Sequence, residues 1–221
     1  MTKYSWKKYN KKSSQLSRKL VKFNNNNNFN FVEDGLYNQI RDIFCLSILI
    51  KKKGRIKILD YGSNVMSLSN IKNKINIKKY DFFIFDPFSE KKKIIHNPFK
   101  ILIYNNKIQV KKENFDIVNF GSSIQYLKNL KDLEEVINFK KTFKIIITHT
   151  PITIKKKFIT KQSNHKNLNQ TIFNYNDLIG FFKKKKFSLV FKSRNETRYA
   201  ASSKNISSTY SLNLVFEKNV K

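Results

Sequence analysis

The sequence is poor in cysteine, glycine, proline and tryptophan. It has a single cysteine in 221 residues, so no disulfide framework can form within the chain, which fits a reducing compartment. Cys45 lies in the apolar run Ile43–Ile50, where we expect a small core residue. That run is too short to cross a bilayer, and the basic N-terminus lacks the apolar segment of a signal peptide. We therefore expect a cytoplasmic protein without a membrane span.

Acidic residues are scarce as well. Lys and Arg number 45 against 15 Asp and Glu, which gives a formal net charge of +30. Such a charge is typical of proteins that bind nucleic acid or an anionic membrane. The lysine runs are spread between apolar segments, however, and a chain rich in Lys, Asn, Ile, Phe and Tyr is also what A/T-rich coding produces. Dispersed charge predicts only non-specific binding to nucleic acid.

The first part of the chain differs in composition from the rest. Residues 1–33 are predicted to form a basic helix, over 4–23, and an asparagine-rich linker around Asn24–Asn28. We expect one domain over residues 34–221. It begins with a helix that Asp34 caps, that runs to about Ile50, and that Gly54 ends before the next apolar run.

From there, strand and helix patterns alternate. We predict helices at 66–75 and 127–137, and a third that Asn174 and Asp177 cap and that runs through Lys184. A polar loop is expected from 149 to about 173. Strands are predicted at 56–59, 80–86, 101–104, 108–110, 115–120, 143–148, 187–193 and 210–217. This order predicts a Rossmann-like α/β fold: a mostly parallel sheet with helices on both faces and an antiparallel C-terminal strand.

The few glycines and prolines fall at informative places. Only five glycines and three prolines occur, yet Gly62, Pro87, Gly121 and Pro151 each follow a predicted parallel strand. The carboxyl ends of parallel strands share one edge of a sheet, where ligands bind in such folds. The sequence therefore predicts a ligand site at this edge.

Two carboxylates belong to the same edge. Asp60 follows the first strand and Asp86 the second, where a carboxylate can accept hydrogen bonds from both hydroxyls of a ribose. An Asx turn at Asp60 and a turn or helix cap at Asp86 are the alternatives. The glycines that let a pyrophosphate approach a helix are missing, which disfavours a diphosphate cofactor.

Four segments resemble a known family in their order and spacing. ILDYGSN, FIFDPF, FDIVNFGSSIQYL and IIITHTPI match the pattern of class I S-adenosylmethionine-dependent methyltransferases. More narrowly, residues 34–218 resemble a bacterial group of methyltransferases, assigned from sequence, that is associated with surface-polysaccharide gene clusters. The counterparts of that group's motifs are Asp60–Ser63, Ser123–Leu127, His149–Pro151, Gln162 and Phe216–Glu217.

The resemblance implies S-adenosylmethionine as the cofactor and a small molecule or glycan as the acceptor, with surface glycan biosynthesis as a candidate role. It places Asp60, Gly62 and Ser63 beside the methionine part and Asp86 at the ribose. Ser122, Ser123 and Gln125 would line the pocket beside the methyl group. Ser63 stands where the family has glycine, and His149 stands where it has arginine.

His149 is the candidate catalytic residue. Methyl transfer to a hydroxyl needs a proton acceptor, and His149 stands at the end of the fifth strand; a histidine satisfied by loop backbone is the alternative. His165 in the following loop and His96 in a turn are weaker candidates, and these three histidines with one cysteine predict no metal site.

Two other classes of function stay open. One is a nucleic-acid-binding protein or RNA methyltransferase, although the segment NFGSS argues against base methylation. The other is a non-catalytic protein with a methyltransferase fold. The sequence identifies neither the acceptor nor the oligomeric state.

Overall fold

The computed structural model describes residues 42–50, 53–62, 75–87, 93–95, 101–162, 165–195 and 209–219. The predicted N-terminal helix and linker lie outside these residues, as do nearly all of the helix predicted at 66–75, Ser63 and His96. The boundary predicted between residues 33 and 34 also lies outside the described residues.

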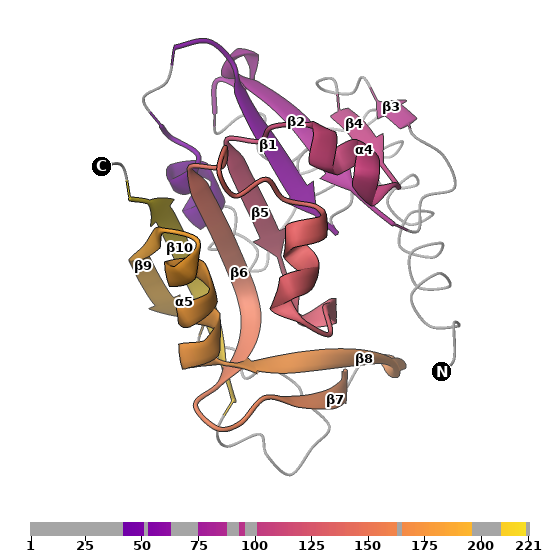
Figure 1. Ribbon diagram of the computed structural model, residues 1–221, viewed down its shortest axis with the longest axis vertical. Helices are drawn as coiled ribbons and strands as arrows, with labels where there is room; N and C mark the ends of the chain where they lie inside the picture. The colour runs from indigo at the N-terminus through magenta and orange to yellow at the C-terminus, as the bar shows by residue number, and fades with distance from the viewer. Residues whose placement is uncertain are drawn as a thin grey trace, which may run out of the picture.

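A mixed β-sheet forms the centre of the fold (Figure 1). Its parallel strands, in the order β4-β2-β1-β5-β6, are Ile101–Tyr104, Tyr80–Phe85, Ile56–Tyr61, Ile117–Gly121 and Lys144–Thr153. Antiparallel strands flank them: β3 (Lys93–Ile95) beside β4, and then β10 (Thr209–Lys218) and β9 (Phe187–Arg194) beyond β6. The predicted mostly parallel sheet with an antiparallel C-terminal strand is confirmed.

Apolar side chains are buried on both faces of this sheet. One cluster joins Ile56 and Ile58 of β1 to Phe44, Cys45 and Ile48, of which the first two lie in a helical turn at residues 42–47. The other cluster lies against α4 (Lys107–Lys112), η3 (Leu130–Glu135) and α5 (Tyr175–Lys184). Helices on both faces are therefore confirmed, and Cys45 is a buried core residue as expected.

A local hydrogen bond decides one element that hydrophobic periodicity did not predict correctly. The strand predicted at 108–110 is wrong, because this segment is helix α4. The side chain of Asn106 caps it by accepting a hydrogen bond from the Ile108 N–H at 2.8 Å. Ile108 and Val110 alternate as in a strand, but only Val110 is buried.

The helix predicted at 127–137 is a 3₁₀ helix rather than an α-helix. A short turn, η2 (Ile124–Tyr126), precedes η3. Leu130, Leu133 and Val136 are all buried. Their spacing of three residues matches the three-residue turn of a 3₁₀ helix, which is why these side chains share one face.

The polar loop predicted at 149–173 is wrong in kind. Strand β6 continues to Thr153, and β7 (Phe158–Gln162) and β8 (His165–Asn174) form an antiparallel hairpin. Pro151 therefore lies inside β6, opposite Ser211 of β10, and not after the strand as predicted. The apolar pattern concealed these strands, because buried positions of the hairpin are polar (Thr160, Gln170 and Thr171) while Ile159 is exposed.

The two other helix boundaries give one confirmation and one correction. Asn174 caps α5 by accepting a hydrogen bond from the Asp177 N–H at 3.1 Å, as predicted. The helix at residue 42 ends at Ser47, before the predicted end near Ile50. Within the part of the chain that the structure describes, no helix is long and apolar enough to cross a membrane.

Candidate functional site

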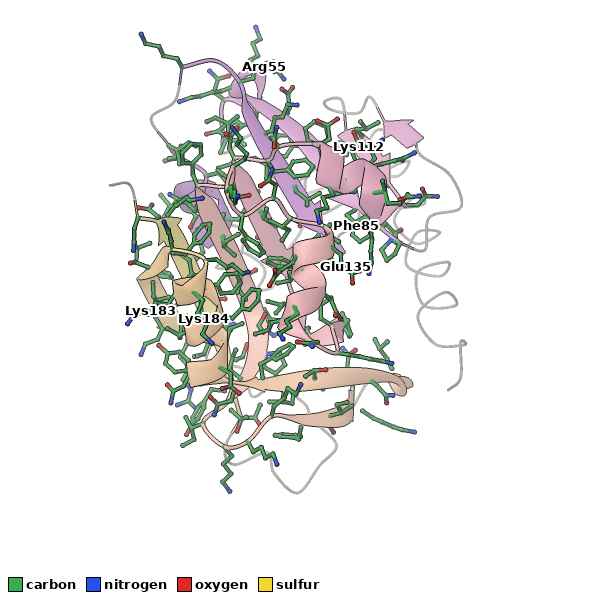
Figure 2. All side chains as sticks on the ribbon, viewed as in Figure 1. Arg55, Phe85, Lys112, Glu135, Lys183 and Lys184 are labelled. Carbon is green, nitrogen blue, oxygen red and sulfur yellow. The ribbon has the colours of Figure 1, made fainter. Side chains whose placement is uncertain are left out.

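The carboxyl ends of β1, β2, β5 and β6 meet along one edge of the sheet, and the β7–β8 hairpin extends beyond that edge (Figure 1). The Gly62 N–H donates a hydrogen bond to the Phe85 carbonyl at 2.8 Å, which joins the end of β1 to the end of β2. Phe85 is labelled in Figure 2, and half-buried Asp86 follows it. Gly62 and Asp86 are therefore brought together at this edge.

Gly62 occupies a position that other residues fit poorly. Its φ is +72°, in the left-handed region that glycine adopts at little cost. A Cβ atom at this position would lie 3.0 Å from the Cβ of Ser123, at the end of β5. The structure thus packs the backbone of one strand end closely against the side chain of another.

Asp60 lies inside β1 (Ile56–Tyr61) and not after the strand as predicted, and it points into the protein. Its side chain is almost fully buried, and the Asn119 Nδ2 amide donates a hydrogen bond to the Asp60 Oδ1 carboxylate oxygen at 2.9 Å. Asn119 lies in β5 and was not among the residues singled out in the sequence. An asparagine at a buried position of an apolar strand is the signal that could have identified it.

Several polar atoms near this edge are buried without a hydrogen-bond partner among the described residues. They include Asn119 Oδ1 in β5, Ser123 Oγ just after β5 and Thr148 Oγ1 in the middle of β6. A buried polar atom without a partner is costly, and in proteins such atoms often face a ligand or water. Gln125 donates through Nε2 to the Ser122 carbonyl at 2.8 Å, so η2 is held against the same edge.

Ser122, just after β5, contacts His149 in the middle of β6. Ser122 Oγ lies 2.9 Å from His149 Nδ1 and donates a hydrogen bond to the His149 carbonyl at 3.2 Å. Both residues have positive φ, +54° and +48°. Burial lowers the pKa of His149 below its usual 6.5, which favours the neutral imidazole at pH 7.

His149 lies at an irregularity within β6 and not in a loop after it. The pairing with β10 shifts register between Leu212 and Leu214, so Thr148 and His149 together lie opposite Asn213. The His149 N–H donates a hydrogen bond to Asn213 Oδ1 at 2.9 Å. Of the other histidines, His165 begins β8 and His96 lies outside the described residues.

A surface hollow of about 440 Å³ lies elsewhere, between α4 and η3, and none of the candidate site residues lines it. Within the described ranges, no group of three or more His, Cys, Asp or Glu side chains is placed to hold a metal ion.

Comparison with known proteins gives matches through structure only. No protein-family model and no curated protein sequence matches the chain. Among similar solved structures is the magnesium protoporphyrin IX methyltransferase of Synechocystis PCC 6803 with bound S-adenosylmethionine (TM-score 0.53, 13% identity, 87% of this chain and 86% of that one).

Two further structures have comparable similarity. The 1,6-didemethyltoxoflavin-N1-methyltransferase of Burkholderia thailandensis, with bound 1,6-didemethyltoxoflavin and S-adenosylhomocysteine, has a TM-score of 0.52 at 8% identity and covers 96% of this chain and 90% of that one. The [4+2]-cyclase SpnF has a TM-score of 0.56 at 10% identity, with 83% and 81% covered. The chain therefore has the Rossmann-like fold of class I S-adenosylmethionine-dependent methyltransferases.

Proposed function

We propose that the protein is a cytoplasmic S-adenosylmethionine-dependent methyltransferase that acts on a small-molecule or sugar acceptor. The observation that carries this proposal is the meeting of Gly62, Asp86 and Ser123 at the carboxyl edge of a sheet with this fold. Similar structures with bound S-adenosylmethionine or S-adenosylhomocysteine support the choice of cofactor.

The residues at this edge fit the proposed cofactor. Gly62 lets the Ser123 side chain lie against the backbone where β1 ends, and Asp86 offers a carboxylate to the ribose hydroxyls. The buried Ser123 Oγ has no partner among the described residues and can bond a polar group of the ligand. Asp60 contributes indirectly, because it holds Asn119 in place.

When bound, S-adenosylmethionine supplies a methyl group that its sulfonium already activates. The protein then has to align the acceptor atom, exclude water and take a proton from a hydroxyl acceptor. In this proposal Ser122, Ser123 and Gln125 line the pocket beside the methyl group, and His149 is the base. Ser63, the residue after Gly62, is proposed to border the methionine part of the cofactor.

The acceptor is proposed to be a small molecule. The two methyltransferases compared above carry names that specify small-molecule acceptors, a magnesium porphyrin and a toxoflavin precursor. A glycan acceptor rests on the sequence resemblance to the group associated with surface polysaccharides.

Isothermal titration calorimetry with S-adenosylmethionine and S-adenosylhomocysteine tests the cofactor. We expect both to bind, and Asp86→Ala to weaken binding by about 1.5–3 kcal/mol, the usual worth of a hydrogen bond to a charged group. Asp81→Ala is the matched control. It removes the same charge from the start of the same strand, where Asp81 pairs with Arg55 at 2.7 Å.

The calorimetry also separates the proposal from its alternatives. If the unmutated protein gives no binding heat with either compound, the protein has the fold but does not bind the cofactor, and the non-catalytic alternative is favoured. Equal weakening by Asp81→Ala and Asp86→Ala would remove Asp86 from the ribose site. The [4+2]-cyclase among the similar structures shows that this fold is not limited to methyltransferases.

A further inference from the structure

The contact between Ser122 and His149 bears on which nitrogen of the His149 imidazole carries a proton. A hydroxyl carries one proton, and Ser122 Oγ has two polar atoms of His149 within reach: the carbonyl oxygen at 3.2 Å, which can only accept, and Nδ1 at 2.9 Å, which accepts or donates according to the tautomer. The location of that proton therefore determines which ring nitrogen of His149 carries a proton.

Only one arrangement makes both contacts hydrogen bonds. If Ser122 donates to the carbonyl oxygen, its Oγ can accept a hydrogen bond from a protonated Nδ1. If Ser122 donates to Nδ1 instead, its contact with the carbonyl oxygen is no longer a hydrogen bond. The first arrangement has one more hydrogen bond and places the ring proton on Nδ1, so a neutral imidazole carries its lone pair on Nε2.

Ser122 and His149 both have a backbone conformation with positive φ, which non-glycine residues rarely adopt. Ser122 follows β5 directly and His149 lies within β6. Positive φ at a non-glycine residue is strained and persists only where surrounding contacts enforce it. The Ser122 N–H donates to the Thr148 carbonyl at 3.0 Å, and the His149 N–H donates to Asn213 Oδ1 at 2.9 Å. These two bonds fix both residues from opposite sides.

The anchor on the β10 side is itself buried. Asn213 Nδ2 donates to Asn195 Oδ1 at 2.6 Å and to Ser193 Oγ at 3.0 Å, and Asn195 Nδ2 donates to Ser211 Oγ at 2.9 Å. Asn213 and Asn195 are both almost fully inaccessible. The irregularity at His149 is thus supported by a satisfied polar network, and such networks make a conformation rigid.

We propose that Ser122 is the positioning residue of His149: its hydroxyl holds the imidazole in the Nδ1–H tautomer, so that Nε2 is the nitrogen that takes the proton of an acceptor hydroxyl. This role rests on the proposed methyltransferase function. In the reaction, Nε2 takes the hydroxyl proton as the oxygen–methyl bond forms and the methyl–sulfur bond breaks, with the electron pair passing to sulfur. His149 becomes an imidazolium ion.

Nitrogen-15 NMR of histidine-labelled protein tests this proposal without cofactor or acceptor. The chain has only three histidines, and a His149→Gln variant identifies the signals of His149. A protonated and an unprotonated ring nitrogen have well-separated shifts. We expect His149 to be neutral at pH 7 with its proton on Nδ1. The ratio of Nδ1–H to Nε2–H should be roughly fivefold higher than in a variant without the Ser122 hydroxyl, the change that one net hydrogen bond provides. The pKa of His149 should lie below 6.5.

Two substitutions at Ser122 separate the hydrogen bond from the strained backbone. Ser122→Ala and Ser122→Gly both remove the hydroxyl, and glycine also accepts the positive φ, so at least the second variant should fold. Both should lose the preference for Nδ1–H. Ser123→Ala removes a neighbouring buried hydroxyl that has no hydrogen-bond partner among the described residues, so it should leave the tautomer unchanged.

The outcomes are distinct from those of the cofactor experiment. A His149 that carries its proton on Nε2, or that is charged at pH 7, overturns the role of Ser122. So does a tautomer that both Ser122 variants leave unchanged. If the NMR results are as expected but calorimetry detects no cofactor, the positioning of His149 stands and the proposed function fails.

Discussion

Three non-glycine residues among those described have positive φ: Ser122, His149 and Lys186. Lys186 follows helix α5, where a left-handed residue is a common way to end a helix. Ser122 and His149 have no such explanation, because neither ends a helix: Ser122 follows β5, His149 lies within β6, and the two contact each other. At the scale of single residues, backbone strain therefore coincides with the candidate site, as it often does in enzymes.

Two glycines provide a matched test of close packing at the site. Gly62 and Gly54 both have positive φ, +72° and +80°, but only at Gly62 would a Cβ contact another residue, 3.0 Å from Ser123. Each change to alanine should cost roughly 1–2 kcal/mol for the left-handed backbone. Gly62→Ala should cost more, because Ser123 must also move.

Urea unfolding of the two variants measures this difference. Gly180→Ala in helix α5 is a control of opposite sign, because its backbone is helical and a Cβ there meets nothing within 4 Å. It should stabilise the protein by about 0.5–1 kcal/mol. Equal losses for Gly54→Ala and Gly62→Ala would show that Ser123 adapts without cost.

At the scale of elements, one side chain links α5 to the segment after β6. Asn174 accepts the Asp177 N–H as the cap of α5, and its Nδ2 donates to the Ile154 carbonyl at 3.1 Å and the Lys155 carbonyl at 2.8 Å. The cap thus orients the helix and also holds the turn that leads into the β7–β8 hairpin.

Substitutions at Asn174 separate these two roles. Asn174→Ala should lower the free energy of unfolding by about 1 kcal/mol or more, since it removes both the cap and the two amide bonds. Asn174→Asp keeps an oxygen that caps the helix but loses the amide donor, so its loss should be smaller. Chemical denaturation compares the two. If aspartate were as destabilising as alanine, the bonds to Ile154 and Lys155 would matter more than the cap.

At the scale of the whole molecule, positive charge is spread over separate elements. Figure 2 labels Arg55 before β1, Lys112 on α4, and Lys183 and Lys184 at the end of α5, and these residues lie in different parts of the molecule. Several lysines contact aromatic faces within the protein, such as Lys57 over Phe83 at 5.7 Å. Described aromatic rings pack largely within the core, which does not favour a surface for stacking bases.

We therefore expect any binding to RNA or DNA to be weakly selective. Fluorescence anisotropy with two oligonucleotides of unrelated sequence should give similar affinities, and both should fall steeply between 50 and 200 mM salt as phosphate contacts are lost. An uncharged crowding agent in place of salt is the control. A preference above about tenfold for one sequence, retained at physiological salt, would contradict this and favour a nucleic-acid function.

Much of the fold could be predicted because the central strands have strong local signals. The buried strands are continuous apolar runs, which a parallel sheet requires when both faces are covered. The ends of these runs place Asp60, Gly62 and Asp86, and parallel pairing then puts them on one edge. Asn174 and Asp177 could likewise be identified as a cap, since capping depends on residues three positions apart.

The sequence by itself thus determined the class of the fold and brought Gly62 and Asp86 to the edge where we propose that the cofactor binds. Only the tertiary structure placed Asn119 under Asp60, joined Ser122 to His149, and anchored His149 to Asn213, which is 64 residues away along the chain. Only the tertiary structure also shows that the segment predicted as a polar loop forms the β7–β8 hairpin. The physical reason is common to these cases. A polar side chain buried in a sheet finds its partner on a neighbouring strand, and strand pairing is a long-range property that local patterns do not contain.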